Sequence, residues 1–201
     1  SDNRQYASIL KLSKGQWQYA AEGVRNSVGF DFHPATQKLY FTDNGRDWLG
    51  DDSPSCELNR VDEEGLFYGF PFQHALDIKD PEFGDIISGY DYVDPILELG
   101  AHVAPTGIAF YDGLQFPEEF TNNLFITLHG SWNRSQKVGY KVIKVSLNDS
   151  GEVATVEDFI TGWLQGEKVI GRPAAPLVIS DGSLLISDDK ANVIYRISFI
   201  K

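Results

Sequence analysis

The chain has 201 residues, of which 42% are hydrophobic and 23% are charged, a composition typical of a folded globular protein rather than a disordered one. Acidic residues outnumber basic residues 29 to 17, giving a formal net charge of −12. Nucleic-acid binding requires a basic face, so this balance argues against a nucleic-acid partner. No apolar run approaches the roughly 20 residues of a membrane-spanning helix. The single cysteine excludes an intrachain disulfide and a cysteine-based zinc site.

Short apolar runs separated by Gly, Pro, Asp and Asn recur along the chain, a pattern that predicts β-strands. They come in sets with a fixed internal order. The second run of each set begins with Leu and carries Thr or Ser near its end, and the third alternates polar with apolar residues. The first runs are 27–32, 105–110 and 176–179, the second runs are 39–43, 124–127 and 184–188, and the third runs are 57–61, 140–145 and 193–197.

A fourth run, 156–160, completes the second set, so the repeating unit is predicted to be four antiparallel strands. Units of this kind build β-propellers, in which neighbouring blades cover both faces of each sheet. A β-sandwich also shows short strands at regular spacing, but it does not require the same order in each unit. The sequence therefore predicts an all-β fold, a β-propeller with four-stranded antiparallel blades.

The two ends of the chain fall inside blades. Residues 7–12 resemble a third run and residues 17–20 a fourth, while the last run, 193–197, is again a third. About three blades are therefore expected, in a single partial propeller domain spanning 1–201, with 71–95 as a loop insertion. The sequence contains no methionine, whereas a primary translation product begins with one, so we expect a processed chain or a fragment.

Polar residues gather where the first two runs meet. Arg25 and Asn26 precede the first run, and Asn44, Gly45 and Arg46 follow the second, so adjacent antiparallel strands should bring them together. Glycine permits close approach of the backbone to a ligand, and oxygen atoms in this segment suit Ca²⁺. The acids nearby are Asp43, Asp47, Asp51 and Asp52. Alternatively, the segment is a tight turn with a solvated acidic loop.

A second polar segment, 129–135, follows the second run of the next set and includes His129 and Arg134. Arg172 precedes the first run of the last set. With Arg25, these arginines would converge on one end of an acidic protein, where local positive charge suits a compact anion. The alternative is that each arginine pairs with a nearby carboxylate.

Several of these segments resemble the PQQ-dependent soluble sugar dehydrogenases, in particular the sorbosone and aldose dehydrogenase-like group. The segments are 23–30, 41–52, 57–60, 69–71, 102–105, 129–135 and 161–164. The resemblance extends over essentially the whole chain and implies the C-terminal half of a six-bladed propeller. It also implies a periplasmic or secreted location.

The resemblance assigns roles to individual residues. It implies that Arg25 and Asn26 contact PQQ, and that main-chain oxygens of Gly45 and Arg46, beside Asn44, bind its Ca²⁺. It further implies that His129 or Arg134 contacts the carboxylates of PQQ and that Arg172 lies near its other edge. Arg25 would also be catalytic, polarising the quinone carbonyl as charge develops there.

The activity implied by the resemblance is oxidation of an aldose-type sugar, with hydride transfer to PQQ. The family's catalytic histidine belongs to the N-terminal half and matches none of the histidines here. The expected partners are therefore the sugar substrate and either the missing half of the propeller or a second copy of this chain. One alternative is a gluconolactonase-like hydrolase with a metal on Asn26, Asn44 and Asp188. Another is a non-catalytic lobe that binds a sugar or a protein.

Overall fold

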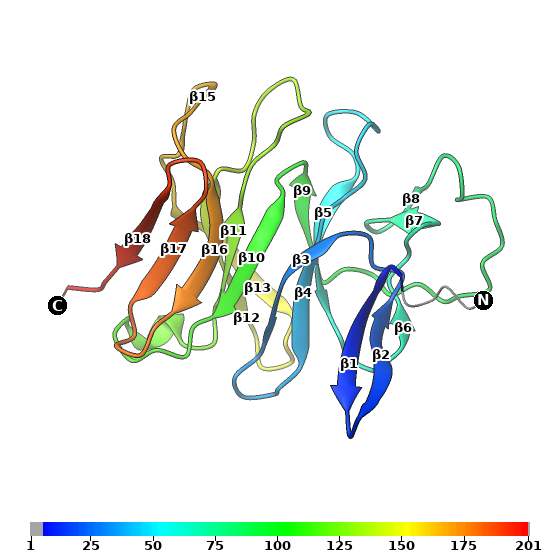
Figure 1. Cartoon of the computed structure of the whole chain (residues 1–201), viewed down its shortest axis with the longest axis horizontal. Coiled ribbons are helices and arrows are strands. Elements are labelled where there is room, and N and C mark those ends of the chain that lie inside the picture. The colour runs from blue at the N-terminus through cyan, green and yellow to red at the C-terminus, as the bar shows by residue number, and fades with distance from the viewer. Residues whose placement is uncertain (1–5, 201) are drawn as a thin grey trace.

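The computed structural model describes residues 6–200, and within them the only helical element is the 3₁₀ turn η1 (Glu118–Phe120). The remaining elements are strands, which confirms the prediction of an all-β fold (Figure 1). They are β1 (Ser8–Ser13), β2 (Gln16–Glu22), β3 (Ser27–Phe32), β4 (Leu39–Asp43), β5 (Ser55–Arg60), β6 (Leu66–Phe67), β7 (Gln73–His74), β8 (Ile78–Lys79), β9 (Leu97–Ala101), β10 (Pro105–Phe110), β11 (Leu124–Leu128), β12 (Lys141–Leu147), β13 (Val153–Ile160), β14 (Leu164–Gln165), β15 (Lys168–Val169), β16 (Pro173–Val178), β17 (Leu184–Asp188) and β18 (Val193–Ile197).

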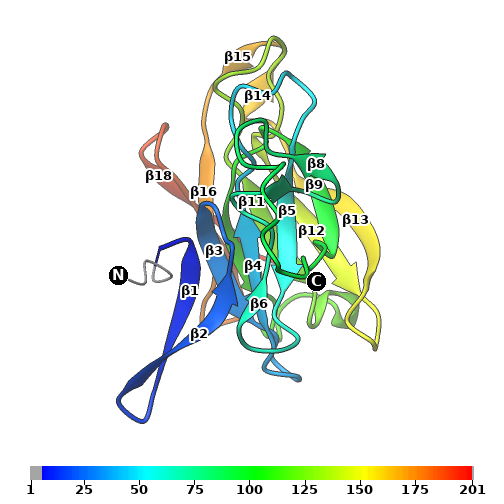
Figure 2. The same cartoon turned by 90° about the vertical axis from the view of Figure 1, so that its right-hand side faces the viewer.

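The larger sheets have the repeated order that the sequence predicts. Two are four-stranded, β3-β4-β5-β9 and β10-β11-β12-β13, and two are three-stranded, β16-β17-β18 and β1-β2-β6. In Figure 1 these sheets stand side by side in chain order, like adjacent blades of a propeller, and Figure 2 shows the β1–β2 hairpin projecting from the rest. Short hairpins, β7-β8 and β14-β15, lie in the connecting loops.

The sequence pattern did not predict β9, the fourth strand of the first complete sheet. It pairs with β5 only after the 71–95 segment, which contains the β7–β8 hairpin. The sequence pattern is local, so it did not link a strand to a neighbour separated from it by a long loop. The segment 71–95 is thus a connection between the third and fourth strands of one sheet.

Glycine allows the first strands of neighbouring sheets to approach closely. A Cβ atom added to Gly29 in β3 would lie 3.0 Å from the Cα of Gly107 in β10. A Cβ atom on Gly107 would in turn lie 2.7 Å from the Cα of Ala175 in β16. These distances leave no room for a side chain, so glycine at the two positions lets successive sheets share a tight junction.

The threonines of the repeated second run connect one sheet to the next. The hydroxyl of Thr42 in β4 donates to the carbonyl of Pro105 in the next sheet at 3.2 Å. Thr127 occupies the corresponding place in β11 and donates to the carbonyl of Ala174 at 2.8 Å. Both side chains are fully buried, so each hydrogen bond satisfies polar atoms that water does not reach.

Three apolar clusters fill the spaces between successive sheets. Alternation along a strand distributes its side chains between two clusters: Tyr40 of β4 packs with β10 and β11, whereas Leu39 and Phe41 pack with residues of β2. Phe125 of β11 similarly packs with β17, on the other side of its sheet. Each inner strand therefore contributes to the core on both of its faces.

Candidate functional site

Asp43, at the end of β4, organises the segment that leads into β3. Its carboxylate accepts hydrogen bonds from the backbone N–H groups of Arg25 at 2.7 Å and Asn26 at 2.6 Å. Burial raises the pKa of Asp43 to about 6, although these hydrogen bonds and the Arg25 charge oppose the increase. The Asn44 side chain donates to the carbonyl of Asn26 at 2.9 Å, so the two strand ends are held together as the sequence predicts.

The guanidinium group of Arg25 lies over the turn that follows β4. Its Nη1 donates to the main-chain oxygen of Asn44 at 2.9 Å, and its Nη2 lies 3.6 Å from Asp47 Oδ2. The side chain remains 23% exposed, and it lines a cleft of about 230 Å³ between the first two complete sheets. The cleft is lined by Arg25, Asn26, Val28, Asn44, Gly45, Asp47, Cys56, His102, Ala104, Thr106, Trp132 and Asn133.

Close packing of the backbone explains why residue 45 is a glycine. A Cβ atom at this position would lie 2.9 Å from the main-chain oxygen of Ser55 and 3.0 Å from that of Pro54. The backbone at Gly45 thus packs against another part of its own loop. Among residues 6–200, no hydrogen bond is directed at the main-chain oxygens of Gly45 or Arg46. Both oxygens keep their acceptor capacity, which a hard cation such as Ca²⁺ requires.

The Arg46 side chain does not join the cleft lining. It forms an ion pair with Asp80, whose Oδ2 also lies 2.8 Å from Nε2 of His74. Burial would raise the pKa of Asp80, but the hydrogen bonds from His74 and Arg46 outweigh it and leave the pKa below its usual value. Burial lowers the pKa of His74. The Arg46 side chain therefore ties the turn after β4 to the 71–95 segment, and Arg46 is not among the residues that line the cleft.

His129 and Arg172 form a second group at the following junction between sheets. Nε of Arg172 donates to the main-chain oxygen of His129 at 3.1 Å, and Nε2 of His129 lies 2.9 Å from Asp189 Oδ1. The backbone N–H of Arg172 donates to Asp188 Oδ1 at 2.9 Å, which repeats the arrangement of Arg25 and Asp43. Neither His129 nor Arg172 lines the cleft described above.

Arg134 lies in the loop after β11 and pairs with Asp52, its Nη2 at 2.6 Å from Oδ1. The same loop reaches the first group through Asn133, whose Nδ2 donates to Asp47 Oδ1 at 2.9 Å. The loops after β4, β11 and β15 emerge at one end of the sheets (Figure 1). The predicted residues thus share this end, but the structure separates them into the cleft, the junction at Arg172 and the outer loop.

Two lining residues of the cleft, His102 and Trp132, lie in segments that carry the resemblance, but the sequence pattern assigned no role to either of them. His102 lies just before β10, with Nε2 2.7 Å from the main-chain oxygen of Gly50, and Trp132 comes from the loop after β11. His102 precedes the first strand of its set, as Arg25 does, and that position in the repeat is the signal that could have identified it. Asp188 is absent from the cleft lining, so it does not complete a metal site with Asn26 and Asn44.

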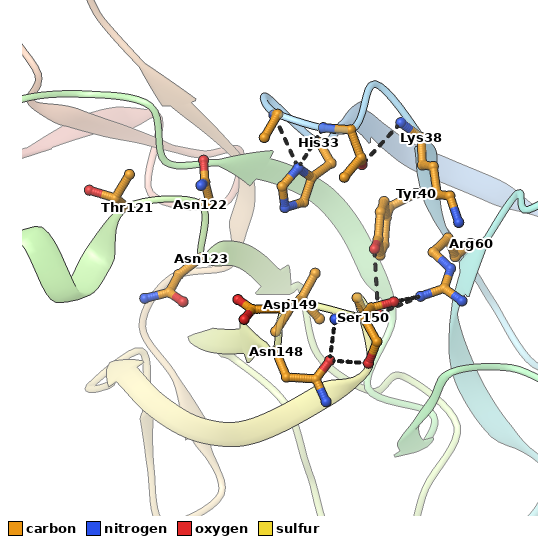
Figure 3. Close-up of a pocket in the computed structure, with 14 residues that line it drawn as sticks. His33, Lys38, Tyr40, Arg60, Thr121, Asn122, Asn123, Asn148, Asp149 and Ser150 are labelled. Atoms are coloured by element: carbon orange, nitrogen blue, oxygen red, sulfur yellow. Dashed lines mark hydrogen bonds between the residues drawn. The ribbon is translucent and has the colours of Figure 1, made fainter.

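A larger cavity of about 440 Å³ opens at the opposite end of the same two sheets (Figure 3). Its cations already have partners: Arg60 Nη2 lies 2.8 Å from Asp62 Oδ2, and Lys38 Nζ lies 2.5 Å from Asp62 Oδ1. Arg60 also donates to the main-chain oxygen of Gly151 at 2.6 Å. Arg25 is paired less closely, with Nη2 3.6 Å from Asp47 Oδ2, so the smaller cleft at Arg25 is the better candidate for an anionic ligand.

Within residues 6–200, no group of three or more His, Cys, Asp and Glu side chains is placed to hold a metal ion. A metal at the cleft would therefore depend on main-chain oxygens such as those of Gly45 and Arg46. In the same described range, no helix has the length and apolar character needed to cross a membrane.

Comparison with known proteins matches residues 71–195 to the TrAA12-like family. An uncharacterized protein from Borreliella burgdorferi is 42% identical over 195 residues, covering 96% of this chain and 52% of the relative. A second uncharacterized protein, from Synechocystis, is 33% identical over 111 residues, which cover 54% of this chain and 24% of that protein. The chain thus spans about half the length of the first relative.

The solved structures with a similar fold are larger proteins. One is the carbohydrate-active enzyme family AA12 protein of Trichoderma reesei in its iodide structure, with TM-score 0.74 and 22% identity, covering 89% of this chain and 53% of that one. Another is the holo PQQ domain of pyranose dehydrogenase from Coprinopsis cinerea, with TM-score 0.72 and 20% identity. The match covers 99% of this chain and 63% of that one. The PQQ-bound aldose sugar dehydrogenase of Streptomyces coelicolor has TM-score 0.63 and 18% identity. The match covers 96% of this chain and 49% of that one. These similarities confirm the propeller-type fold.

Proposed function

Because this chain belongs to the TrAA12-like family, we propose that it is part of a sugar oxidoreductase that uses PQQ together with Ca²⁺. The observation that carries the proposal is that Arg25 and Gly45 line one cleft, while the main-chain oxygens of Gly45 and of the adjacent Arg46 accept no hydrogen bond among residues 6–200. PQQ carries several carboxylates, so an acidic protein needs cationic groups to bind it. The Arg25 guanidinium and a cation on the two carbonyl oxygens would supply them.

The residues at the cleft have distinct roles in this proposal. When bound, PQQ supplies a quinone that accepts a hydride from the sugar. Arg25 would stabilise negative charge on the bound cofactor, and its position is set before binding by Asn44 and Asp47. Asn26 would orient the cofactor through its side chain, while Asp43 holds the backbone of Arg25 and Asn26 in place.

The second group, His129 and Arg172, would contact a more distant part of the same ligand. His129 follows β11 and Arg172 precedes β16, so the pair lies one junction beyond the cleft. We place the proton-abstracting histidine outside these residues, in additional chain that is either covalently attached or a separate partner. General-base catalysis contributes about 10²–10⁴-fold, so the 201-residue chain should turn over very slowly without that partner.

Calorimetric titration of PQQ, with and without Ca²⁺, tests the proposal independently of turnover. The chain should bind PQQ only with Ca²⁺ present, and Arg25→Ala should weaken binding about 10-fold or more, as expected for a charge-assisted hydrogen bond. Arg60→Ala is the matched control because Arg60 lies at the opposite cavity and should leave binding unchanged. Equal binding by wild type and Arg25→Ala would rule out the cleft as the cofactor site.

A further inference from the structure

Two exposed tryptophans meet at the edge of the candidate site. Trp48, in the loop after β4, is 78% exposed, and Trp132, in the loop after β11, is 65% exposed. Their rings stand edge to face, with centroids 5.6 Å apart and an interplanar angle of 84°. Large aromatic side chains are normally buried at least in part, so a pair left in solvent indicates a surface that contacts another molecule.

The positions of both indoles are set by polar contacts between their loops. Asn133 donates to Asp47 Oδ1 at 2.9 Å, immediately beside the two tryptophans in sequence. Further along, the backbone N–H of Ser135 donates to Asp51 Oδ1 at 3.1 Å, and Arg134 pairs with Asp52. The loops come from different sheets and are joined at several points, so the aromatic pair has a defined geometry before any ligand binds.

Trp48 also has an unusual backbone conformation. Its φ is +69°, in the left-handed region that bulky residues avoid. Such a conformation costs about 1–3 kcal/mol and persists only where surrounding contacts maintain it. Here the conformation accompanies an indole that remains in solvent, so the strain is not offset by burial of that side chain.

The aromatic pair adjoins the cleft rather than standing apart from it. Trp132 and Asn133 line the cleft together with Arg25. Oδ1 of Asn133 is shielded from solvent and has no hydrogen-bond partner among residues 6–200. The entrance therefore combines an apolar aromatic surface with the polar groups that line the cleft.

We propose that Trp48 and Trp132 form a stacking platform for a pyranose ring at the entrance of the cleft. A pyranose with equatorial hydroxyls presents apolar C–H faces and a polar rim, so a face can pack on indole while the hydroxyls of the rim face the polar groups that line the cleft. The patch consists of two side chains, whereas a stable protein interface involves about 20–30 residues from each partner. The choice of a sugar rests on the proposed function.

Titration with methyl β-D-glucopyranoside, followed by NMR of the ligand, tests this platform without cofactor. The blocked anomeric oxygen prevents oxidation at that carbon, so binding is measured without turnover. Ring C–H signals should shift upfield in the presence of the protein. Trp48→Ala and Trp132→Ala should each weaken binding about 2- to 10-fold, the range expected for aromatic stacking, and Trp132→Phe should recover part of the loss.

Trp17→Ala is the matched control, since Trp17 is 67% exposed but lies on β2, and this variant should bind as wild type does. Mannitol, an open-chain polyol without ring faces, should bind more weakly than the glucoside. Absence of glucoside binding, unchanged affinity in both tryptophan variants, or equal binding of mannitol would each overturn the proposal. Loss of self-association in the variants without any sugar effect would overturn it in favour of a protein contact. A failure of PQQ binding would refute the proposed cofactor chemistry without altering these outcomes.

Discussion

The sheet β10–β13 and the sheet β16–β18 have the same internal order but different surroundings. The first lies between two neighbouring sheets, whereas the second has one packed neighbour among the described residues. Val142 of β12 pairs with Thr127, and Ile194 of β18 pairs with Ser187, so the two residues occupy matching positions. Val142 is 0% exposed, but Ile194 is 68% exposed.

This contrast shows that the repeat defines strand order and pairing, while burial depends on the adjacent sheet. The charged residues at matching positions differ for another reason, since Asp43 and Asp188 are buried alike, at 5% and 3% exposure. Asp43 and Asp188 both end a second strand and both accept a backbone hydrogen bond from an arginine. Asp43 lies opposite Glu57 on the neighbouring strand, whereas Asp188 lies opposite Val193. Matched substitutions at these positions test the comparison directly.

The largest effect is expected at Glu57, as a dependence of stability on pH. Burial, together with the nearby charge of Asp43, raises the pKa of Glu57 from 4.5 to about 7. The protonated form is therefore favoured by folding, and its contribution is present below about pH 4.5 and lost as pH rises through 7. Between these limits the free energy of unfolding should fall by about 3 kcal/mol more in wild type than in Glu57→Gln, measured by urea denaturation.

Asp188 should behave in the opposite way. Burial opposes ionisation, but hydrogen bonds from Arg172, Ala191 and Tyr195 outweigh it and hold the pKa of Asp188 below 3.8. Its contribution to stability is therefore present above pH 3.8 and lost as pH falls. For Glu57→Gln and for Asp188→Asn, the difference in the free energy of unfolding between wild type and the variant is followed against pH. Slopes of the same sign for the two variants would contradict the comparison.

The next effect concerns the matched apolar positions. Val142→Ala should lower the free energy of unfolding by about 2 kcal/mol, because it removes two buried methyl groups and leaves a cavity. Ile194→Ala removes more atoms but should change stability by no more than about 0.5 kcal/mol, because the side chain is already in solvent. Chemical denaturation of both variants measures the difference. A larger loss at Ile194 would mean that another surface covers β18 in solution.

The smallest effect is expected from the hydroxyl groups. Thr127→Val keeps the shape of the side chain but removes one of two donors to the carbonyl of Ala174, which Thr106 continues to satisfy, so the cost should be at most about 1 kcal/mol. Ser187 holds the corresponding place in β17 and, among residues 6–200, its hydroxyl bonds only to Ala175 within its own sheet. Ser187→Ala should therefore have a smaller effect in the same denaturation experiment. Equal losses in the two variants would show that the contact between sheets adds nothing.

Much of the fold could be predicted from the sequence because strand signals are local. Alternating apolar residues and Gly, Pro or Asn breaks located the strands from β3 to β5 and from β10 to β13. The pairing of β5 with β9 was missed because it depends on a long connection rather than on neighbouring residues. The contact between the start of β3 and the end of β4 could be predicted for the same local reason, because the two strands are adjacent. It brings Arg25 and Asn26 to Asn44 and Gly45.

The sequence by itself thus determined the strand order and the chemistry available at one end of the sheets. Tertiary structure decided which of those residues face a common space. The Arg46 side chain does not line the cleft because it pairs with Asp80, a buried carboxylate from a distant segment. Trp48 contacts Trp132 because the loops after β4 and β11, from two different sheets, emerge side by side. Contacts of this kind depend on how sheets pack, and a local sequence pattern carries no information about the neighbour that a side chain will find.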